Sequence, residues 1–297
     1  MPRRLFYCDH YAIPLPPGHK FPMSKYRMVR DLLAELDFYA FKCAPMASAA
    51  VVELAHDPEY VRNFIHGTLP AAALRRIGFP WSKGLVKRTL ASVGGTLGAT
   101  EDAFDVGWGG NLAGGTHHAF RAEGSGFCVF NDIAVAIQSL RSHGRIERAA
   151  VIDLDVHQGD GTAQIFENDP GVLTVSMHCQ SNFPLRKQRS TLDVDLGDGL
   201  GDEDYLRALD HLLPTVFAFE PSIIYYQSGV DGLASDTLGK LSLTHAGLQE
   251  RDRRVMAAVC AHRIPLVVTL GGGYSAPINL TALAHANTFR MAQEIFQ

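Results

Sequence analysis

Four side chains of types that bind metal ions lie within the eleven residues VIDLDVHQGDG, residues 151–161. Val151, Ile152 and Leu154 form the apolar body of a predicted buried strand, and Asp153, Asp155, His157 and Asp160 lie at or just past its carboxyl end. Ligands of open α/β sheets bind at that end of the strands. Residues two apart on an extended chain point the same way, so Asp155 and His157 can converge on one cation. The alternative is a loop of solvated carboxylates, which is disfavoured because charges on an apolar strand are rarely buried without partners.

Asp231 supplies a second carboxylate just past another predicted strand, residues 222–227. Together with Asp155 and His157 it gives three protein ligands and leaves a position for water, which is typical of a catalytic metal site. Zinc in such a site lowers the pKa of its water to about 7 and polarises a carbonyl group. Manganese, iron and cobalt also accept this set, because two of its ligands are oxygens.

Two adjacent histidines, His117 and His118, follow a double glycine in the segment GGTHHAF, residues 114–120. Hydrolysis needs a base for the water proton and an acid for the leaving group. The two imidazoles can supply both if a carboxylate orients each, and Asp153 and Asp160 are the candidates. The alternative is that the histidines bind a metal themselves or cap the loop.

Tyr274 follows three glycines in the segment GGGYS, residues 271–275. Its phenol could donate to a developing oxyanion, and loss of such a donor typically costs about 10² to 10³ in rate. Glycine clusters also bind phosphates, but the chain has no GxxxxGK[ST] motif, and GGTLGA lies within a helical pattern. The GxSxG motif of serine hydrolases is also absent. The residues therefore favour metal-assisted hydrolysis.

The predicted strands and helices that carry these residues alternate along the chain from about residue 127 onward. The expected strands span residues 5–8, 38–42, 151–154, 172–177, 222–227 and 266–270, and the longer expected helices span residues 85–104, 127–140, 204–219 and 243–262. This alternation predicts parallel βαβ units and a helix-covered sheet. No linker or repeat interrupts it, so we expect one domain over residues 1–297. The segment IGFPWSK, residues 77–83, is either a loop at the rim of the site or a packed corner.

The composition excludes several classes of protein. The chain has 297 residues, 46% of them hydrophobic, and a net charge of −4, which provides no basic surface for nucleic acid. Its five cysteines are scattered without a CxxC pair, which argues against a disulfide framework and a cysteine-rich zinc site. Neither a signal peptide nor an apolar run of about 20 residues is found. We expect a cytoplasmic protein, and nothing in the sequence indicates its oligomeric state.

Eight segments of the chain together resemble the zinc-dependent histone deacetylase family, which includes bacterial acetoin-utilisation and acetylpolyamine amidohydrolase proteins. The segments are GGTHHAF, GFCVFNDIA, VIDLDVHQGDG, TVSMH, YYQSGVDGL, LGKLSLT, TLGGGYS and HANTF. The compact length and the VHQGDG variant are most similar to the class IV-like branch and its bacterial relatives. The resemblance implies an arginase/deacetylase-like three-layer α/β fold, with a central parallel sheet flanked by helices.

The resemblance also implies roles for individual residues. Zinc would bind Asp155, His157 and Asp231. His118, paired with Asp160, would be the general base, and His117, paired with Asp153, its electrostatic partner. Tyr274 would hydrogen-bond the substrate carbonyl. Tunnel-lining positions would be Phe127, Phe183, Leu238 and Gly272, and a structural potassium ion would be held by Asp153, Asp155, His157, Ser176 and Met177.

The substrate is left open by the sequence. The leading hypothesis is removal of an acetyl or longer fatty acyl group from N-ε-acyl-lysine in a protein or peptide. The second is a deacetylase of acetylpolyamines or related acyl-amines, for which Asp202, Glu203 and Asp204 could attract a cation or could equally cap the following helix. The third is a catalytically silent scaffold. Pro80 stands where many eukaryotic relatives carry an aspartate that grips the peptide, and Gln158 replaces a common histidine without disturbing the expected ligands.

Overall fold

The structure is a computed structural model that describes residues 2–11 and 13–297. Its centre is an eight-stranded sheet with the strand order β2-β1-β3-β8-β7-β4-β5-β6, in which all pairs are parallel. The strands are β1 (Arg3–Tyr7), β2 (Tyr39–Cys43), β3 (Trp108–Asn111), β4 (Ala149–Asp153), β5 (Val172–Cys179), β6 (Leu192–Leu196), β7 (Ile224–Gln227) and β8 (Leu266–Thr269). Parallel neighbours need helical crossovers, and these cover both faces of the sheet.

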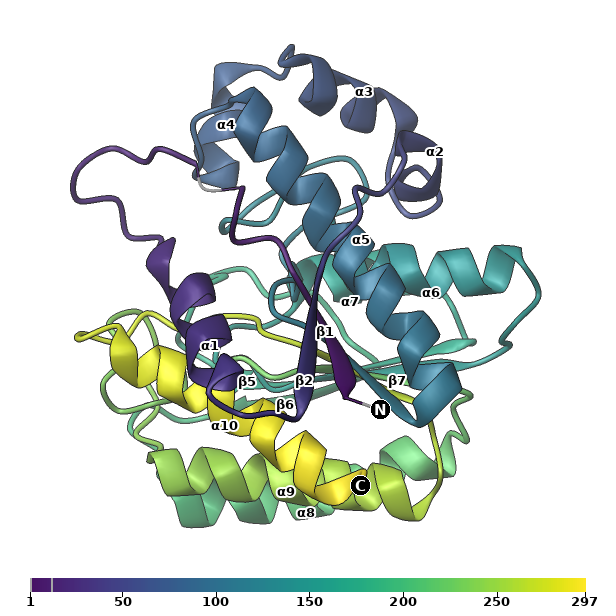
Figure 1. Cartoon of the computed structure of the whole chain (residues 1–297), viewed down its shortest axis with the longest axis vertical. Coiled ribbons are helices and arrows are strands. Elements are labelled where there is room, and N and C mark those ends of the chain that lie inside the picture. The colour runs from purple at the N-terminus through teal and green to yellow at the C-terminus, as the bar shows by residue number, and fades with distance from the viewer. Residues whose placement is uncertain (1, 12) are drawn as a thin grey trace.

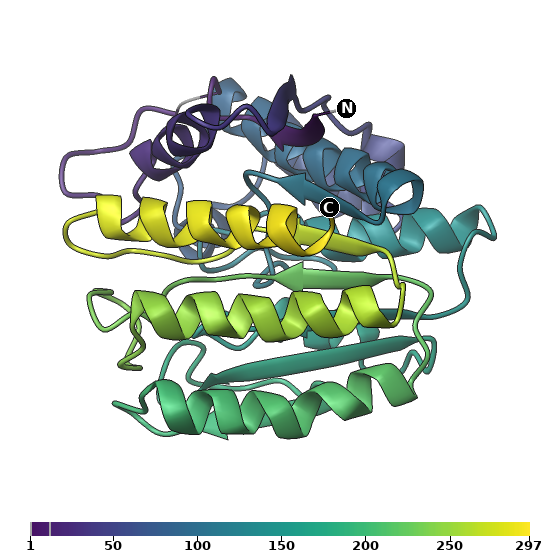
Figure 2. The ribbon, with the colours of Figure 1, turned by 60° about the horizontal axis from the view of Figure 1, so that its bottom comes forward.

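The helices form one layer on each face. On one face lie α1 (Ser24–Ala34), α8 (Asp202–Ala218), α9 (His245–Ala261) and α10 (Asn279–Ile295), and Figure 2 shows the last three side by side in front of the sheet. The other layer contains α5 (Lys83–Val106), α6 (Asp132–Ser142) and α7 (Asp160–Phe166). At the top of Figure 1, α2 (Ala49–Val52), α3 (Pro58–His66) and α4 (Ala71–Ile77) lie around the upper end of α5. The predicted three-layer α/β fold is thereby confirmed.

The central strands are buried along their whole length because helices lie on both sides. Every residue of β4, β5 and β7 is buried. Asp153 at the end of β4 pairs in register with Ser176 of β5 and with Gln227 at the end of β7, and Gln227 pairs with Thr269 at the end of β8. The carboxyl ends of β4, β7 and β8 are therefore level, and the loops that follow them meet at one edge of the sheet.

Three elements were not predicted from the sequence: β3, β6 and α4. The sequence of β3 is WGGN, in which two glycines remove the apolar alternation that would indicate a strand. The structure explains Gly109, because a side chain there would overlap the carbonyl of Ala99 on α5. Close packing of α5 on β3 thus depends on a residue that weakens the strand signal.

The expected start of α6 at residue 127 was wrong. The helix begins at Asp132, and the Asn131 side chain caps it by accepting the N–H of Ala134. Phe127 has φ 67°, which no α-helix accommodates. Residues 127–131 instead form a loop whose apolar side chains pack toward α3, α4 and the cavity described below.

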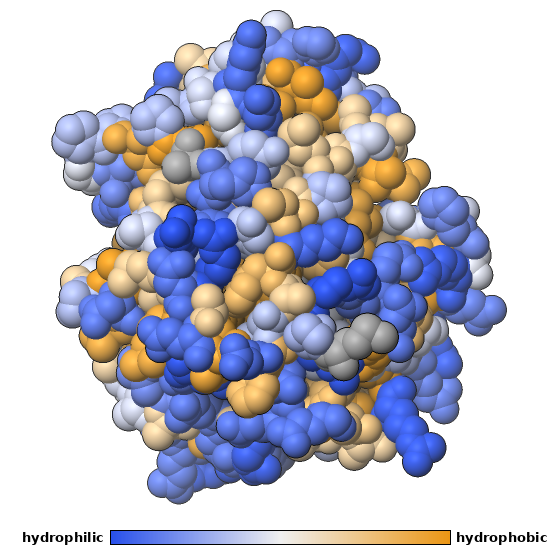
Figure 3. Space-filling model, in the orientation of Figure 1, coloured by the Kyte–Doolittle hydropathy of each residue, from blue (hydrophilic) through white to orange (hydrophobic). Residues whose placement is uncertain are grey.

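Among the described residues no helix combines the length and hydropathy needed to cross a membrane. The face shown in Figure 3 is largely hydrophilic, with small hydrophobic patches that polar residues separate.

Candidate active site

The site lies at the carboxyl ends of β3, β8, β7 and β4, which are neighbours in the sheet. The loop after β3 carries His117 and His118, and the loop after β8 carries Tyr274. Asp231 follows β7, and Asp155 and His157 follow β4. The structure therefore brings together residues that are up to 157 positions apart in the sequence, as the strand-end argument predicted.

The two carboxylates and the imidazole selected as metal ligands converge on one point. Nδ1 of His157 lies 3.0 Å from Oδ1 of Asp155 and 3.0 Å from Oδ2 of Asp231. Backbone groups fix both carboxylates: Gly272 N–H donates to Asp155 at 2.6 Å, and Val156 N–H donates to Asp231 at 2.9 Å. One ligand atom from each of the three residues lies within 4.8 Å of the others, and all three residues are buried.

This donor set fits a divalent metal ion. Asp155 and Asp231 are 1% and 0% exposed, and their ion-pair partners among the described residues are imidazoles: His157 for both, and His117 for Asp155 at 4.0 Å. Burying two adjacent carboxylates without a cation is costly, and burial together with the Asp155 charge raises the pKa of Asp231 to about 7. Two oxygens and one nitrogen, with room for a further ligand, are the donors that catalytic zinc sites use.

The two histidines each hold a carboxylate through Nδ1, as predicted. His118 lies 2.6 Å from Oδ1 of Asp160, at the start of α7, and His117 lies 2.7 Å from Oδ2 of Asp153. The two rings are 4.0 Å apart between centroids. A carboxylate accepts a hydrogen, so Nδ1 of each ring carries the proton. Nε2 of His117 lies 4.0 Å from Oδ1 of Asp155, and the His118 ring lies 5.9 Å from the His157 ring between centroids.

The environments of the two histidines set them apart. Burial and the charge of His117 lower the pKa of His118 to about 4, so this ring is neutral at neutral pH. Burial would also lower the pKa of His117, but the charges of Asp153 and Asp155 outweigh it and raise the pKa to about 9. A neutral imidazole beside a charged one is an arrangement that suits a base and an electrostatic stabiliser.

Asp132 positions the histidine loop and was missed from the sequence. It is fully buried, and its carboxylate accepts the N–H groups of Gly115 and Thr116 and the hydroxyls of Thr96 and Thr116. The signal was present, because Asp132 is the one charged residue in the quoted segment GFCVFNDIA. A charge inside an apolar segment is rarely buried without several donors.

His56, also missed, ties the same loop to α2 and α3. Its Nδ1 donates to the carbonyl of Phe120 at 2.9 Å, and its Nε2 accepts the N–H of Asn131 at 2.8 Å. The ring therefore joins the two ends of the segment from residue 120 to residue 131. Burial lowers the pKa of His56 to about 4.

Two further residues hold Tyr274. The Asp236 carboxylate accepts the N–H of Tyr274 at 2.6 Å and those of Leu238 and Gly239 at 2.8 and 2.9 Å. Lys25 is 1% exposed and donates to the carbonyl of Gly271 at 3.1 Å, and its Nζ lies 5.2 Å from the centre of the Tyr274 ring. Neither residue was selected from the sequence, because their roles depend on contacts with distant segments.

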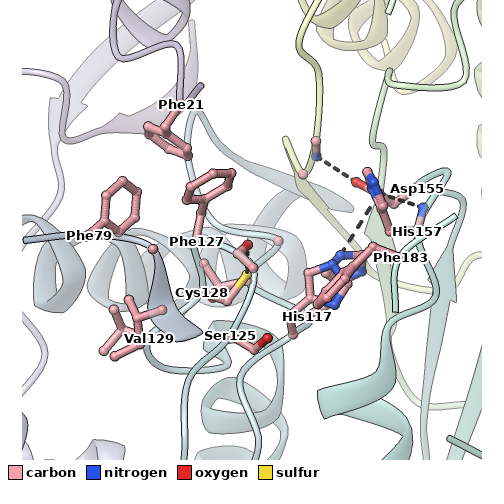
Figure 4. A pocket seen from close by; sticks show the side chains of 18 of the residues that line it. Phe21, Phe79, His117, Ser125, Phe127, Cys128, Val129, Asp155, His157 and Phe183 are labelled. Atoms are coloured by element: carbon pink, nitrogen blue, oxygen red, sulfur yellow. Dashed lines mark hydrogen bonds and ion pairs between the residues drawn. The ribbon is translucent and has the colours of Figure 1, made fainter. Parts of the chain in front are cut away.

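A cavity of about 750 Å³ leads to this cluster. Its lining includes all four residues expected in the tunnel, namely Phe127, Phe183, Leu238 and Gly272. The Phe183 ring meets the His118 ring edge-on, with 4.9 Å between centroids, and the centroids of the Phe127 and Tyr274 rings are 6.2 Å apart. Figure 4 shows Phe127 grouped with Phe21 and Phe79 on one side, and Phe183 beside the histidine and aspartate cluster on the other. The walls are thus aromatic, and the polar groups lie deeper.

The segment at residues 77–83 proves to be both a corner and part of the wall. Phe79 is buried and lines the cavity, whereas the Trp81 Nε1–H donates to the carbonyl of Phe64 on α3. The preceding helix α4 fixes Phe127, because Ile77 O accepts the Phe127 N–H at 2.8 Å. Pro80 is exposed and lies outside the lining of the cavity.

The other predicted site residues divide into two groups. Asp153, Ser176 and Met177, named for a potassium site, are buried, and Asp153 and Ser176 are in register on β4 and β5. The acidic residues named for cation capture are elsewhere: Asp202, Glu203 and Asp204 form the first turn of α8 and do not line the cavity. Asp202 instead accepts the N–H and hydroxyl of Thr244.

The fold and this group of side chains are those of the arginase and deacetylase superfamily. The sequence model of the histone deacetylase domain matches residues 19–289. Histone deacetylase 2 of Arabidopsis thaliana is 31% identical over 271 residues, covering 86% of this chain and 70% of its own. A probable deacetylase of Archaeoglobus fulgidus is 32% identical over 251 residues, covering 77% of this chain and 67% of its own. The chain belongs to the histone deacetylase family.

Two further comparisons are consistent with membership of this family. An uncharacterized protein of Picosynechococcus sp. is 43% identical over 294 residues and covers 98% of both chains. The crystal structure of the HDA15 HD domain superimposes with a TM-score of 0.79 at 20% identity, covering 99% of this chain and 90% of that one. At that identity the structural match supports the fold. Deacetylase activity in general follows from the family.

Proposed function

We propose that residues 1–297 form one catalytic domain that removes an acyl group from N-ε-acyl-lysine by metal-assisted hydrolysis. The observation that carries the proposal is the buried Asp155, His157 and Asp231 group at the base of an aromatic cavity, flanked by two histidine–aspartate pairs. These three residues would hold zinc, with another divalent metal as the alternative. Bound there, the metal would acidify a water molecule and polarise the substrate carbonyl.

His118 would move the protons. Because its Nδ1–H is committed to Asp160, its Nε2 lone pair is free to accept a proton from water. The same nitrogen can then return the proton to the lysine amine as the amide C–N bond breaks. His117, held by Asp153 and 4.0 Å away between ring centroids, would stabilise negative charge as it develops.

Tyr274 would donate its phenolic hydrogen to the carbonyl oxygen of the substrate. The hydroxyl has no partner of its own among the described residues, and burial together with the charges of Asp231 and Asp155 raises its pKa well above 10. It therefore keeps its proton over the working range of pH. Asp236 and Lys25 hold its backbone and the preceding glycines.

The cavity supports acyl-lysine over an acetylpolyamine. Phe127 and Phe183 give aromatic walls to an aliphatic stem. At its mouth the exposed lining residues include four cations, Lys20, Arg75, Arg76 and Lys240; Arg76 pairs with Glu123 and Lys240 with Asp198, and neither Lys20 nor Arg75 has an ion pair with a described carboxylate. A polyamine would carry further positive charge to this mouth, where like charges repel it.

The proposal includes a structural potassium ion, held by Asp153, Asp155, His157, Ser176 and the backbone of Met177. Its support is that Asp153 and Ser176 lie level on adjacent strands and are 3% and 2% exposed. A hard cation suits such buried oxygen groups. Elemental analysis of protein purified with and without potassium salts would test it.

The function is tested with one acetyl-lysine peptide and protein reconstituted with zinc. We expect hydrolysis, and we expect Tyr274→Phe to lower kcat by about 10² to 10³. The matched control is Tyr205→Phe on α8, which makes the same change outside the cavity and should keep kcat within about twofold. Zinc-loaded protein that hydrolyses no acyl-lysine peptide would refute the proposal.

A further inference from the structure

The cavity extends beyond the catalytic cluster into an inner chamber against α5. This chamber is lined by Tyr26, Leu85, Arg88, Thr89 and Ser92, together with the start of the histidine loop. With the lysine stem between the aromatic walls, as proposed above, the acyl group would point past the metal-type ligands toward the α5 residues that line the same cavity. The residues of the chamber therefore face the acyl group.

Arg88 is an unusual residue in this position. It is 8% exposed, its Nη1 has no hydrogen-bond partner among the described residues, and it makes no ion pair with a described carboxylate. Its guanidinium stacks on the Tyr26 ring with 4.3 Å between Cζ and the centroid. A buried charge without a counterion is costly, and a ring face compensates it only in part. An anion brought by a ligand would complete the site.

The rest of the chamber also favours an anion. The Ser92 hydroxyl accepts the N–H of Gly114 at 3.1 Å, which leaves its own hydrogen available to donate. Thr89 supplies another buried hydroxyl. Asp155 is the one carboxylate in the described lining, and it lies at the catalytic cluster. Negative charge in the chamber thus meets donors and no acidic side chain.

The chamber is continuous with the catalytic cluster, because the residues of both line one cavity. Lys25 Nζ is 5.2 Å from the Tyr274 ring centre and 5.3 Å from the Tyr26 ring centre, and Tyr26 stacks on Arg88. Contacts of 5.2, 5.3 and 4.3 Å therefore connect the Tyr274 ring to the Arg88 guanidinium through Lys25 and Tyr26.

We propose that Arg88 makes the inner chamber a carboxylate-binding subsite, so that the protein hydrolyses N-ε-acyl-lysines whose acyl group ends in a carboxylate, such as succinyl or glutaryl. The inference rests on the proposed function, because the reaction is the same. Water adds across the amide C–N bond, the lysine nitrogen leaves as the amine, and the dicarboxylic acid is released. Arg88 would hold the distal carboxylate by a paired, charged hydrogen bond.

The test compares kcat/KM of the zinc-loaded full chain for three peptides that differ only on one lysine: acetyl, succinyl and levulinoyl. Levulinoyl replaces the distal carboxylate of succinyl with an uncharged methyl ketone of the same size. We expect wild type to favour succinyl over levulinoyl by about tenfold to hundredfold, the range of a charged hydrogen bond. In Arg88→Met this ratio should fall to about one, and Arg88→Lys should keep part of it.

The control is Lys87→Met, which removes a charge from the exposed face of the same helix and should keep the wild-type ratio. Acetyl turnover with no succinyl preference in wild type would overturn this inference and leave the proposed function standing, even if the Arg88 variants failed to fold. A preference that survives in Arg88→Met would also overturn it. Equal use of the two acyl groups, with inhibition by acetate that weakens in Arg88→Met, would assign Arg88 to the released product instead. No turnover of any peptide would refute the proposed function itself.

Discussion

His56 should make the stability of the protein fall between pH 7 and pH 5. In the folded state its Nε2 accepts the Asn131 N–H, so a proton on that nitrogen would break the contact. The pKa of His56 is about 4 in the folded protein, and its ordinary value of 6.5 applies to the unfolded chain. Below pH 6.5 the unfolded chain therefore binds a proton that the folded chain does not, and stability is lost as the pH falls toward 4. Linkage gives a loss of about 2 kcal/mol at pH 5 for this pKa difference.

The assay is urea unfolding of wild type and His56→Gln at pH 7.5 and pH 5. Glutamine cannot take up the proton, so wild type should lose about 2 kcal/mol more than the variant between the two pH values. His66→Gln, on the exposed end of α3, makes the same substitution where the side chain is solvated, and should behave as wild type. An equal loss of stability in wild type and His56→Gln between the two pH values would show that protonation of His56 does not cause the loss.

Three other substitutions test the site. His118→Ala should lower kcat by about 10² to 10⁴ with little change in melting temperature, and activity near wild type would exclude it as the base. Asp231→Asn should reduce bound zinc, measured by elemental analysis after dialysis, and full occupancy would contradict its role as a ligand. Asp132→Ala should lower the free energy of unfolding in urea by about 3 kcal/mol or more, because it leaves buried N–H groups unpaired; a change below about 1 kcal/mol would show that the network is dispensable.

The site could be predicted from the sequence where one short segment contains both a buried strand and the candidate catalytic residues. The segment around Asp155 combines an apolar run with charged residues, so the strand and the ligands follow from the same residues. The strand before Asp231 and the glycines before Tyr274 gave equally local signals. Because parallel strands end at one edge, these local predictions sufficed to bring the candidate ligands together.

The parts that sequence reasoning missed depend on contacts between distant segments. Asp236 acts on Tyr274 across 38 positions, and Lys25 acts on Gly271 across 246. No periodicity connects such pairs. The strand β3 was missed for a related reason: Gly109 lies against Ala99 of α5 and Gly110 against Leu5 and Phe289, and two glycines carry no apolar pattern of their own. The chamber around Arg88 likewise appears only once α1 and α5 are packed together.

Metal-dependent hydrolysis is tested most directly by turnover of an acetyl-lysine peptide by one preparation, assayed as purified, after removal of its metal by a chelator, and after return of zinc. We expect activity that is lost on chelation and restored by about one equivalent of zinc per chain, with His157→Ala inactive throughout. Activity that survives complete removal of the metal, or a zinc-loaded protein that leaves every acyl-lysine peptide intact, would contradict the proposed function.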